Sequence, residues 1–245
     1  MLKQHPPEYA VLSALRGKVI CIEGPIGVGK STLGETIVTY CTKKGMPARF
    51  YPECVDEDYL KLYLKDMPRH AFGFQKDTLE KRIQVFREAI EFARTGGVAI
   101  IDRGVLGDIA FATMQHDGGL FSEEDWECYK RVIGRALLYE PDFILHLKCD
   151  AETAIERVKR RNHTEESVYE TSYMEKLGKA TSAVLAEHYH GQLLERDWSP
   201  DLSASGNTVL EITDETCYDV LSQIVLEIMK PLLALLTTVI FKENE

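Results

Sequence analysis

The sequence predicts an α/β fold in which a five-stranded parallel sheet is flanked by helices. Five short apolar segments alternate with long amphipathic ones, and several short segments are apolar at consecutive positions, as strands buried on both faces are. Connections of this length between strands favour parallel pairing. The expected strands are residues 18–23, 48–53, 98–103, 143–148 and 208–212, and helical patterns cover residues 31–44, 79–94 and 151–161.

Composition limits the kinds of partner. Apolar residues make up 44% and charged residues 28% of the 245 residues, which is typical of a globular protein. The 29 basic and 39 acidic residues give a net charge of −10, so the average field repels a nucleic-acid backbone. A small phosphorylated ligand needs only a local positive pocket. We therefore expect a small-molecule partner and no nucleic acid.

Segment composition bears on location and domain organisation. The six cysteines show no spacing typical of a zinc site, and the first residues show no signal-peptide pattern. The most apolar run, residues 231–241, is about half the ~20 residues that a membrane-spanning helix needs. These features predict a cytoplasmic protein without a membrane partner. We expect an N-terminal arm at residues 1–16, one domain at 17–230 and a C-terminal tail at 231–245.

Residues 24–31, Gly-Pro-Ile-Gly-Val-Gly-Lys-Ser, match the phosphate-binding pattern G-x-x-x-x-G-K-[ST]. The match follows an apolar strand and opens a helix. Glycines let the backbone wrap around phosphates, and the helix aims free N–H groups at them. Lys30 is expected to reach the β- and γ-phosphates of ATP, and Ser31 to bind Mg²⁺. The nucleotide-binding set predicted in this segment is Gly24, Gly27, Gly29, Lys30, Ser31 and Thr32.

Two further features fit a phosphate site. The third expected strand ends in Asp102-Arg103, where an acidic residue lies near the metal in proteins with this loop; we assign Asp102, with Ser31, to Mg²⁺. The helical pattern at residues 151–161 ends in basic residues, with Arg157 and Arg161 on one face. These arginines form either a lid that closes over the transferring phosphate or a solvated cationic helix end.

Further motifs follow in order along the chain: Pro52-Glu53, Phe72-Gly73-Phe74-Gln75, Arg82, Asp102-Arg103-Gly104, Asp108, and Arg157 with Arg161. Together with the phosphate-binding motif, this series resembles the deoxycytidine, deoxyguanosine and deoxyadenosine kinase family from about residue 18 to residue 227. The resemblance implies a P-loop kinase fold with an arginine lid. It also implies ATP-dependent phosphorylation of a deoxynucleoside 5′-hydroxyl for nucleotide salvage, and a homo-oligomer.

The resemblance implies a role for each matching residue. Glu53 is implied as the general base for the 5′-hydroxyl, a role that suits a carboxylate at a strand's carboxyl end. Arg103 is implied as a cation for the phosphates, with Lys30 and Asp102 completing the catalytic set. Gln75 is implied to read the base edge, because an amide carries both a donor and an acceptor. The other implied substrate-binding residues are the aromatic Tyr63, Phe74 and Phe111, and Glu166, which with Tyr63 holds the 3′-hydroxyl.

Arg82 and Asp108 bear on base preference. In the family, this pair resembles that of enzymes which prefer cytosine or purine bases. A guanidinium only donates hydrogen bonds, so it suits ring acceptors and conflicts with the N3–H of thymine. Ala112 stands where the family has an aromatic residue and leaves room for a larger base. We therefore expect a purine, deoxyadenosine first, or deoxycytidine.

Three alternatives stay open at this stage. A nucleoside monophosphate kinase of the thymidylate kinase type shares the loop, an Asp-Arg element and an arginine lid. A second alternative is a nucleotide-dependent switch or binding module that has lost transfer activity. The residues whose presence argues against it are Lys30, Ser31, Glu53 and Arg103. Arg82 and Asp108 could also form an exposed surface ion pair, which would say little about function.

Overall fold

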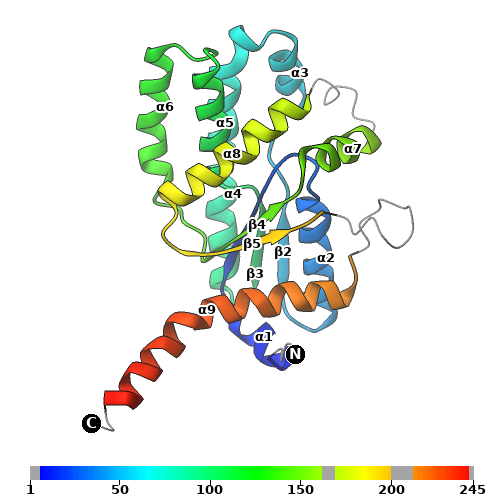
Figure 1. The fold of residues 1–245 in the computed structure, drawn as a ribbon, viewed down its shortest axis with the longest axis vertical. Helices are drawn as coiled ribbons and strands as arrows, with labels where there is room; N and C mark the ends of the chain where they lie inside the picture. The colour runs from blue at the N-terminus through cyan, green and yellow to red at the C-terminus, as the bar shows by residue number, and fades with distance from the viewer. Residues whose placement is uncertain (1–5, 162–168, 200–211, 243–245) are drawn as a thin grey trace.

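The computed structural model describes residues 6–161, 169–199 and 212–242. At its centre is a parallel sheet with the strand order β2-β3-β1-β4-β5 (Figure 1). The strands are β1 (Val19–Glu23), β2 (Ala48–Tyr51), β3 (Val98–Asp102), β4 (Phe143–Lys148) and β5 (Gln192–Asp197). The predicted α/β class with a five-stranded parallel sheet is therefore confirmed.

The fifth strand differs from the prediction. Residues 208–211 of the expected segment lie outside the described residues, and Ile212 is not part of a strand. β5 is formed by Gln192–Asp197, which pairs with β4 at one edge of the sheet. Its side chains are half-buried or exposed, because an edge strand is covered on fewer sides. Its polar sequence therefore lacks the apolar run on which the prediction depended.

One face of the sheet is covered by α2 (Lys30–Lys43), and by α1 (Glu8–Ala14) and α9 (Asp214–Lys242), which lie against each other (Figure 1). Ile20 and Ile22 of β1 point to this face and join a buried cluster with Leu33 of α2 and Leu221 of α9. The alternation of side chains along β1 explains why its neighbours Val19 and Cys21 belong to clusters on the opposite face.

The opposite face carries the longer helices. α4 (Met67–Arg94) packs on β3 and α5 (Val105–Asp117), and α5 packs on α8 (Thr171–His188). α3 (Glu57–Lys65) and α6 (Glu123–Ala136) lie outside this layer, and α7 (Ala151–Arg161) leads from β4 towards α8 (Figure 1). The helices predicted at 31–44, 79–94 and 151–161 correspond to α2, the second half of α4, and α7.

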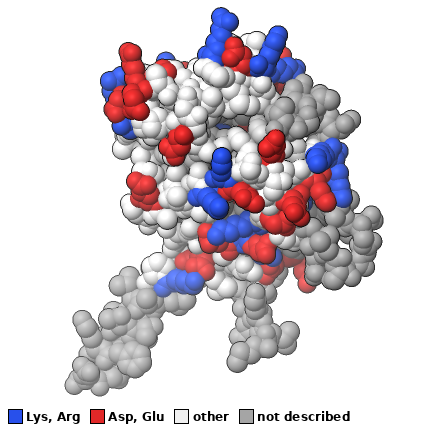
Figure 2. All heavy atoms as spheres, turned by 45° about the horizontal axis from the view of Figure 1, so that its top comes forward, with Lys and Arg blue, Asp and Glu red and all other residues white. Residues whose placement is uncertain are grey.

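The chain ends bear on the predicted domain limits. Val11 and Leu15, in the predicted arm, are buried in the same cluster as β1 and α9, and α9 continues through Pro231, the first residue of the predicted tail. The division into 1–16, 17–230 and 231–245 stays a prediction. Among the described residues, none of the helices combines the length and apolar character needed to cross a membrane. Lys and Arg are interspersed with Asp and Glu over the described face in Figure 2.

Candidate active site

The phosphate-binding loop connects β1 to α2 at the carboxyl end of the sheet. Gly24 and Gly27 have φ angles of 147° and 79°, in a range that other residues avoid. A Cβ at either position would lie 2.4 Å from a backbone oxygen, that of Leu147 or of Ala154. The loop is thus held against β4 and α7 by contacts that only glycine permits. α2 begins at Lys30 without a side-chain cap, so the N–H groups of its first turn face the loop.

Lys30, Ser31 and Asp102 meet beside this loop. The Lys30 ammonium is buried, donates to the backbone oxygen of Pro25 at 3.1 Å and lies 3.9 Å from Asp102 Oδ1. Burial, and then the charge of Arg103, lower the pKa of Lys30. Ser31 Oγ donates to Asp102 Oδ2, whereas Asp102 Oδ1 is buried without a hydrogen-bond partner among the described residues.

This arrangement fits Mg²⁺. A hydroxyl and one carboxylate with a free oxygen are the few protein ligands that Mg²⁺ takes beside phosphates and water. Ser31 and Asp102, which contact each other beside the loop, are the residues that would hold the ion.

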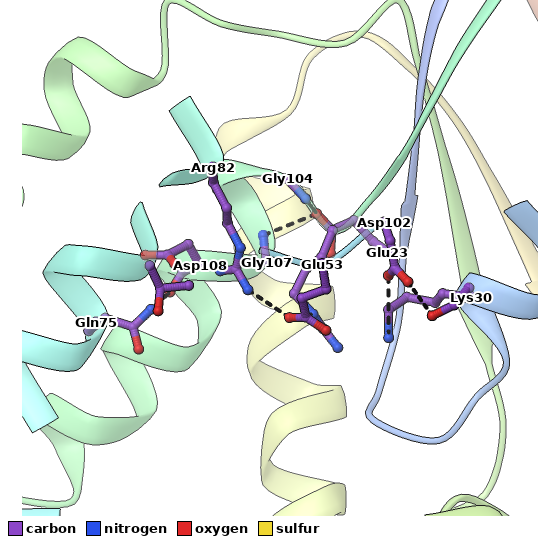
Figure 3. A network of polar contacts seen from close by, with 12 residues as sticks. Glu23, Lys30, Glu53, Gln75, Arg82, Asp102, Gly104, Gly107 and Asp108 are labelled. Carbon is purple, nitrogen blue, oxygen red and sulfur yellow. Dashed lines mark hydrogen bonds and ion pairs between the residues drawn. The ribbon is translucent and has the colours of Figure 1, made fainter. Parts of the chain in front are cut away.

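Glu53 lies between two arginines. Its Oε1 accepts hydrogen bonds from Arg82 Nη2 at 2.8 Å and from Arg103 Nε at 2.9 Å. Although burial raises the pKa of Glu53, the charges of Arg103, Arg82 and Lys30 outweigh it and lower the pKa to about 2. Its side chain is 32% exposed. Figure 3 shows Glu53 between the group of Arg82, Asp108 and Gln75 and the group of Lys30 and Asp102.

Arg103 is held in an unusual backbone conformation. Its φ is 67°, and among the described residues it alone of the non-glycine residues has a positive φ. Such a conformation costs roughly 1–2 kcal/mol. Its guanidinium lies 5.0 Å from the centre of the Phe111 ring, and Nη1 and Nη2 are buried without a partner among the described residues. Two free donors of a fixed cation beside Glu53 suit the oxygens of a phosphate.

Glu23 holds this segment in place, and the sequence analysis did not identify it. Its buried Oε1 accepts from the backbone N–H of Gly104 at 2.7 Å and of Gly107 at 3.2 Å (Figure 3). A Cβ at Gly107 would lie 2.4 Å from Glu23 Oε2 and 2.6 Å from Arg103 Cγ. Burial raises the pKa of Glu23. Its position directly before the glycine-rich loop was the available signal, but only the fold brings it to Arg103.

A cavity of about 300 Å³ opens beside Glu53. Of the predicted substrate-binding residues, it is lined by Glu53, Tyr63, Phe74, Arg82 and Phe111, and Gln115, Thr78 and Tyr173 also contribute. Tyr63 and Phe74 stack at 4.9 Å between ring centres with an interplanar angle of 5°. Flat aromatic side chains together with polar groups suit a nucleobase and sugar.

Gln75 lies behind the cavity lining. It is 2% exposed, and its Nε2 donates to the backbone oxygen of Asp108 at 3.2 Å. The Asp108 carboxylate accepts from Arg82 Nη1 and from the Tyr129 hydroxyl. Burial raises the pKa of Asp108, although Arg82 and Tyr129 oppose the shift. Arg82 is 3% exposed and Asp108 is fully buried, so the alternative of an exposed surface ion pair is wrong.

The predicted lid is only partly described. Arg157 donates from Nη1 to the Val28 oxygen in the loop at 2.9 Å and from Nη2 to the Trp198 oxygen at 3.1 Å. Arg157 therefore contacts the phosphate-binding loop. Arg161 ends α7, but its side chain lies outside the described part of the chain, as does Glu166. Their roles stay predictions.

The protein is similar to known kinases over most of its length. The sequence model of the family described as "Deoxynucleoside kinase" matches residues 20–229. A deoxyadenosine kinase of Dictyostelium discoideum is 32% identical over 182 residues, which cover 74% of this chain and 71% of that protein. A deoxyguanosine kinase of Lactobacillus acidophilus is 27% identical, with 77% of this chain and 81% of that protein covered.

The comparison with solved structures also finds deoxynucleoside kinases. A deoxyadenosine kinase from M. mycoides, with the products dCMP and a flexible dCDP bound, is 25% identical and has a TM-score of 0.65, covering 84% of this chain and 97% of that one. The sheet order, the glycine-rich loop and the carboxylate between two arginines lie within the matched region. This chain belongs to the deoxynucleoside kinase family.

Proposed function

We propose that this kinase transfers the γ-phosphate of ATP to the 5′-hydroxyl of a deoxynucleoside, with deoxyadenosine favoured and deoxycytidine next. The observation that carries the proposal is the position of Glu53. Its carboxylate lines the cavity, is bonded to Arg82 and Arg103, and lies between Arg82 and the group of Lys30 and Asp102. A hydroxyl group bound there lies between a proton acceptor and the phosphate site.

On the acceptor side, Glu53 takes the proton of the 5′-hydroxyl. The hydroxyl oxygen bonds to the γ-phosphorus of ATP as the bond from that phosphorus to ADP breaks. The neighbouring cations keep Glu53 ionised, so it is a weak base that orients the hydroxyl and accepts the proton late, once the P–O bond forms. Arg103 has two unpaired donors next to this carboxylate and stabilises the charge that develops on the phosphate oxygens.

On the donor side, Lys30 and the N–H groups of the loop bind the phosphates. Ser31 and Asp102 would hold Mg²⁺, which would supply positive charge that neutralises the phosphates. The free Oδ1 of Asp102 supports this assignment. Arg157, with Arg161, is proposed to act as the lid above these groups.

The base preference rests on the buried Arg82–Asp108 pair. Arg82 only donates, which favours ring acceptors of purines and cytosine over the N3–H of thymine. Relatives named as deoxyadenosine kinase and as deoxyadenosine/deoxycytidine kinase support this range. A cytoplasmic location and a homo-oligomeric state accompany this proposal as predictions from the family resemblance.

The test is ADP release with Mg-ATP and a panel of acceptors: the four deoxynucleosides, adenosine and dTMP. We expect turnover with deoxyadenosine first, then with deoxycytidine or deoxyguanosine, and little with thymidine. Turnover with dTMP alone would overturn the proposal in favour of a thymidylate kinase type. Absence of turnover with every acceptor would favour a nucleotide-dependent switch that has lost transfer activity.

A further inference from the structure

Gln115, on α5, is part of the cavity wall, and none of the motifs discussed above includes it. It is 4% exposed and lines the cavity together with Phe74, Arg82 and Phe111. Its Nε2 donates to Gln75 Oε1 at 2.7 Å. A buried glutamine at the wall of this cavity is one of the polar groups that can orient a ligand there.

The direction of both amides is determined by the backbone. The Asp108 carbonyl oxygen can only accept, so the amide nitrogen of Gln75 must face it. Gln75 Nε2 lies 3.2 Å from this oxygen. Gln75 Oε1 must then face Gln115, which in turn must present its nitrogen to Gln75. Gln115 therefore has one possible orientation, with its own oxygen turned away from Gln75.

That oxygen has no donor. Gln115 Oε1 is buried and has no hydrogen-bond partner among the described residues. A buried acceptor without a partner is costly, and native structures usually supply one from the protein, from water or from a ligand. A side chain that lines the cavity and keeps an unpaired acceptor calls for a ligand that brings an N–H group.

We propose that Gln115 is a specificity-determining residue, which selects bases that carry an exocyclic amino group over bases with an oxo group at the same position. The amino group of adenine or cytosine donates to Gln115 Oε1, whereas the oxo group of hypoxanthine or uracil offers only an acceptor. The inference rests on the proposed function and deepens it. The Gln115 amide, whose orientation is fixed by Gln75, is added to the Arg82–Asp108 pair as a determinant of base preference.

The test compares two nucleoside pairs that differ in this one group: deoxyadenosine with deoxyinosine, and deoxycytidine with deoxyuridine. For each pair, the ratio of kcat/KM for the amino base to that for the oxo base is measured in the unchanged protein and in Gln115→Met. Methionine has a similar length but no amide. We expect the ratio to favour the amino base in the unchanged protein and to fall about tenfold in Gln115→Met.

Gln84→Met is the matched control. Gln84 is an exposed glutamine on α4 that bonds Glu88, and its substitution should leave both ratios within about twofold of the unchanged protein. A Gln115→Met protein that keeps the original ratio would overturn the inference, as would an unchanged protein that does not distinguish amino from oxo bases. Absence of turnover with every nucleoside in the unchanged protein would instead overturn the proposed function.

Gln115→Glu provides a second test of the role of Gln115 if Gln115→Met does not fold. A protonated glutamic acid donates to Gln75 Oε1 through its O–H and keeps a free carbonyl acceptor, whereas the ionised form repels Gln75 Oε1. The ionisable groups in this network are Asp108 of α5, Arg82 of α4 and Tyr129 of α6. They are common to all variants. The amino-to-oxo ratio of Gln115→Glu should therefore rise as the pH is lowered, beyond any change in Gln84→Met; a ratio that does not rise would contradict the inference.

Discussion

Lys30 and Ser31 follow one another in the chain and lie beside Asp102 on the phosphate side of the site, whereas the polar network of the base side is assembled from three helices. This network consists of Gln75 and Arg82 from α4, Asp108 and Gln115 from α5, and Tyr129 from α6. On the phosphate side, backbone groups of one loop are proposed to carry much of the binding. On the base side, the contacts are made by side chains that the fold has brought together, except that Gln75 donates to the backbone oxygen of Asp108.

The difference separates two kinds of effect. A phosphate-side change alters a step that every nucleoside shares, so it should lower turnover for all acceptors by the same factor. A base-side change alters contacts that differ from one base to another, so it should change the order of preference. Glu53 lies where the two sides meet, and Arg103 donates a hydrogen bond to it.

Among changes confined to one side of the site, the largest effect is expected for Lys30→Met. The buried ammonium beside Asp102 would be replaced by an apolar chain of similar length, which removes the cation that we propose binds the transferring phosphate. We expect kcat to fall by roughly 10²–10³-fold for every acceptor. Steady-state kinetics with two nucleosides check both the size of the fall and its uniformity.

Lys43→Met is the control on the same helix. Lys43 is 58% exposed and pairs with Asp214 at the surface, so its loss should change kcat less than about twofold. A Lys30→Met protein whose loss differs strongly between nucleosides would break the separation of the two sides.

A smaller effect is expected for Gly107→Ala, which acts on Arg103 beside Glu53, where the phosphate side and the base side meet. The new methyl group would collide with Glu23 and with the stem of Arg103, and shift the guanidinium that bonds Glu53. We expect kcat to fall on the order of 10-fold to 100-fold, since small displacements of catalytic groups are costly.

Gly134→Ala on α6 is the matched control. A Cβ at Gly134 would meet nothing within 4 Å, so kcat should not change, and the melting temperature should rise because alanine favours a helix by roughly 0.5–1 kcal/mol. If both alanine variants kept full activity, the contact of Glu23 with Gly107 would not matter for Arg103.

The smallest effect is the response to acid. The ionised form of Glu53 is favoured in the folded protein, because its pKa is lowered to about 2 from an ordinary 4.5. The reactive carboxylate is therefore present above that pKa and is lost only as the pH falls through about 2. At saturating Mg-ATP, kcat should show no acid limb from Glu53 between about pH 5.5 and 7.5. An acid limb in this range that Glu53→Asp displaces would show that the three cations do not control Glu53.

The same contrast explains how much the sequence could predict. Lys30, Ser31 and Asp102 follow from a local motif and a strand end. Gln115 was missed because its role depends on the distance between α4 and α5, and Glu23 because its partners lie more than 80 residues along the chain. β5 was missed for a different reason. An edge strand that is only half-buried has no need of the apolar pattern that marks a central strand.

The most direct test of the account is the behaviour of Glu53→Gln. The amide keeps the size of the side chain and an oxygen for Arg82 and Arg103, but it cannot accept the proton of the hydroxyl. The account predicts that kcat falls by roughly 10²–10⁴-fold for every nucleoside, while Mg-ATP binding measured by calorimetry stays within about threefold. Glu88→Gln, an exposed change on α4, should alter neither. Turnover of Glu53→Gln within tenfold of the unchanged protein would contradict the role of Glu53 and, with it, the proposed mechanism.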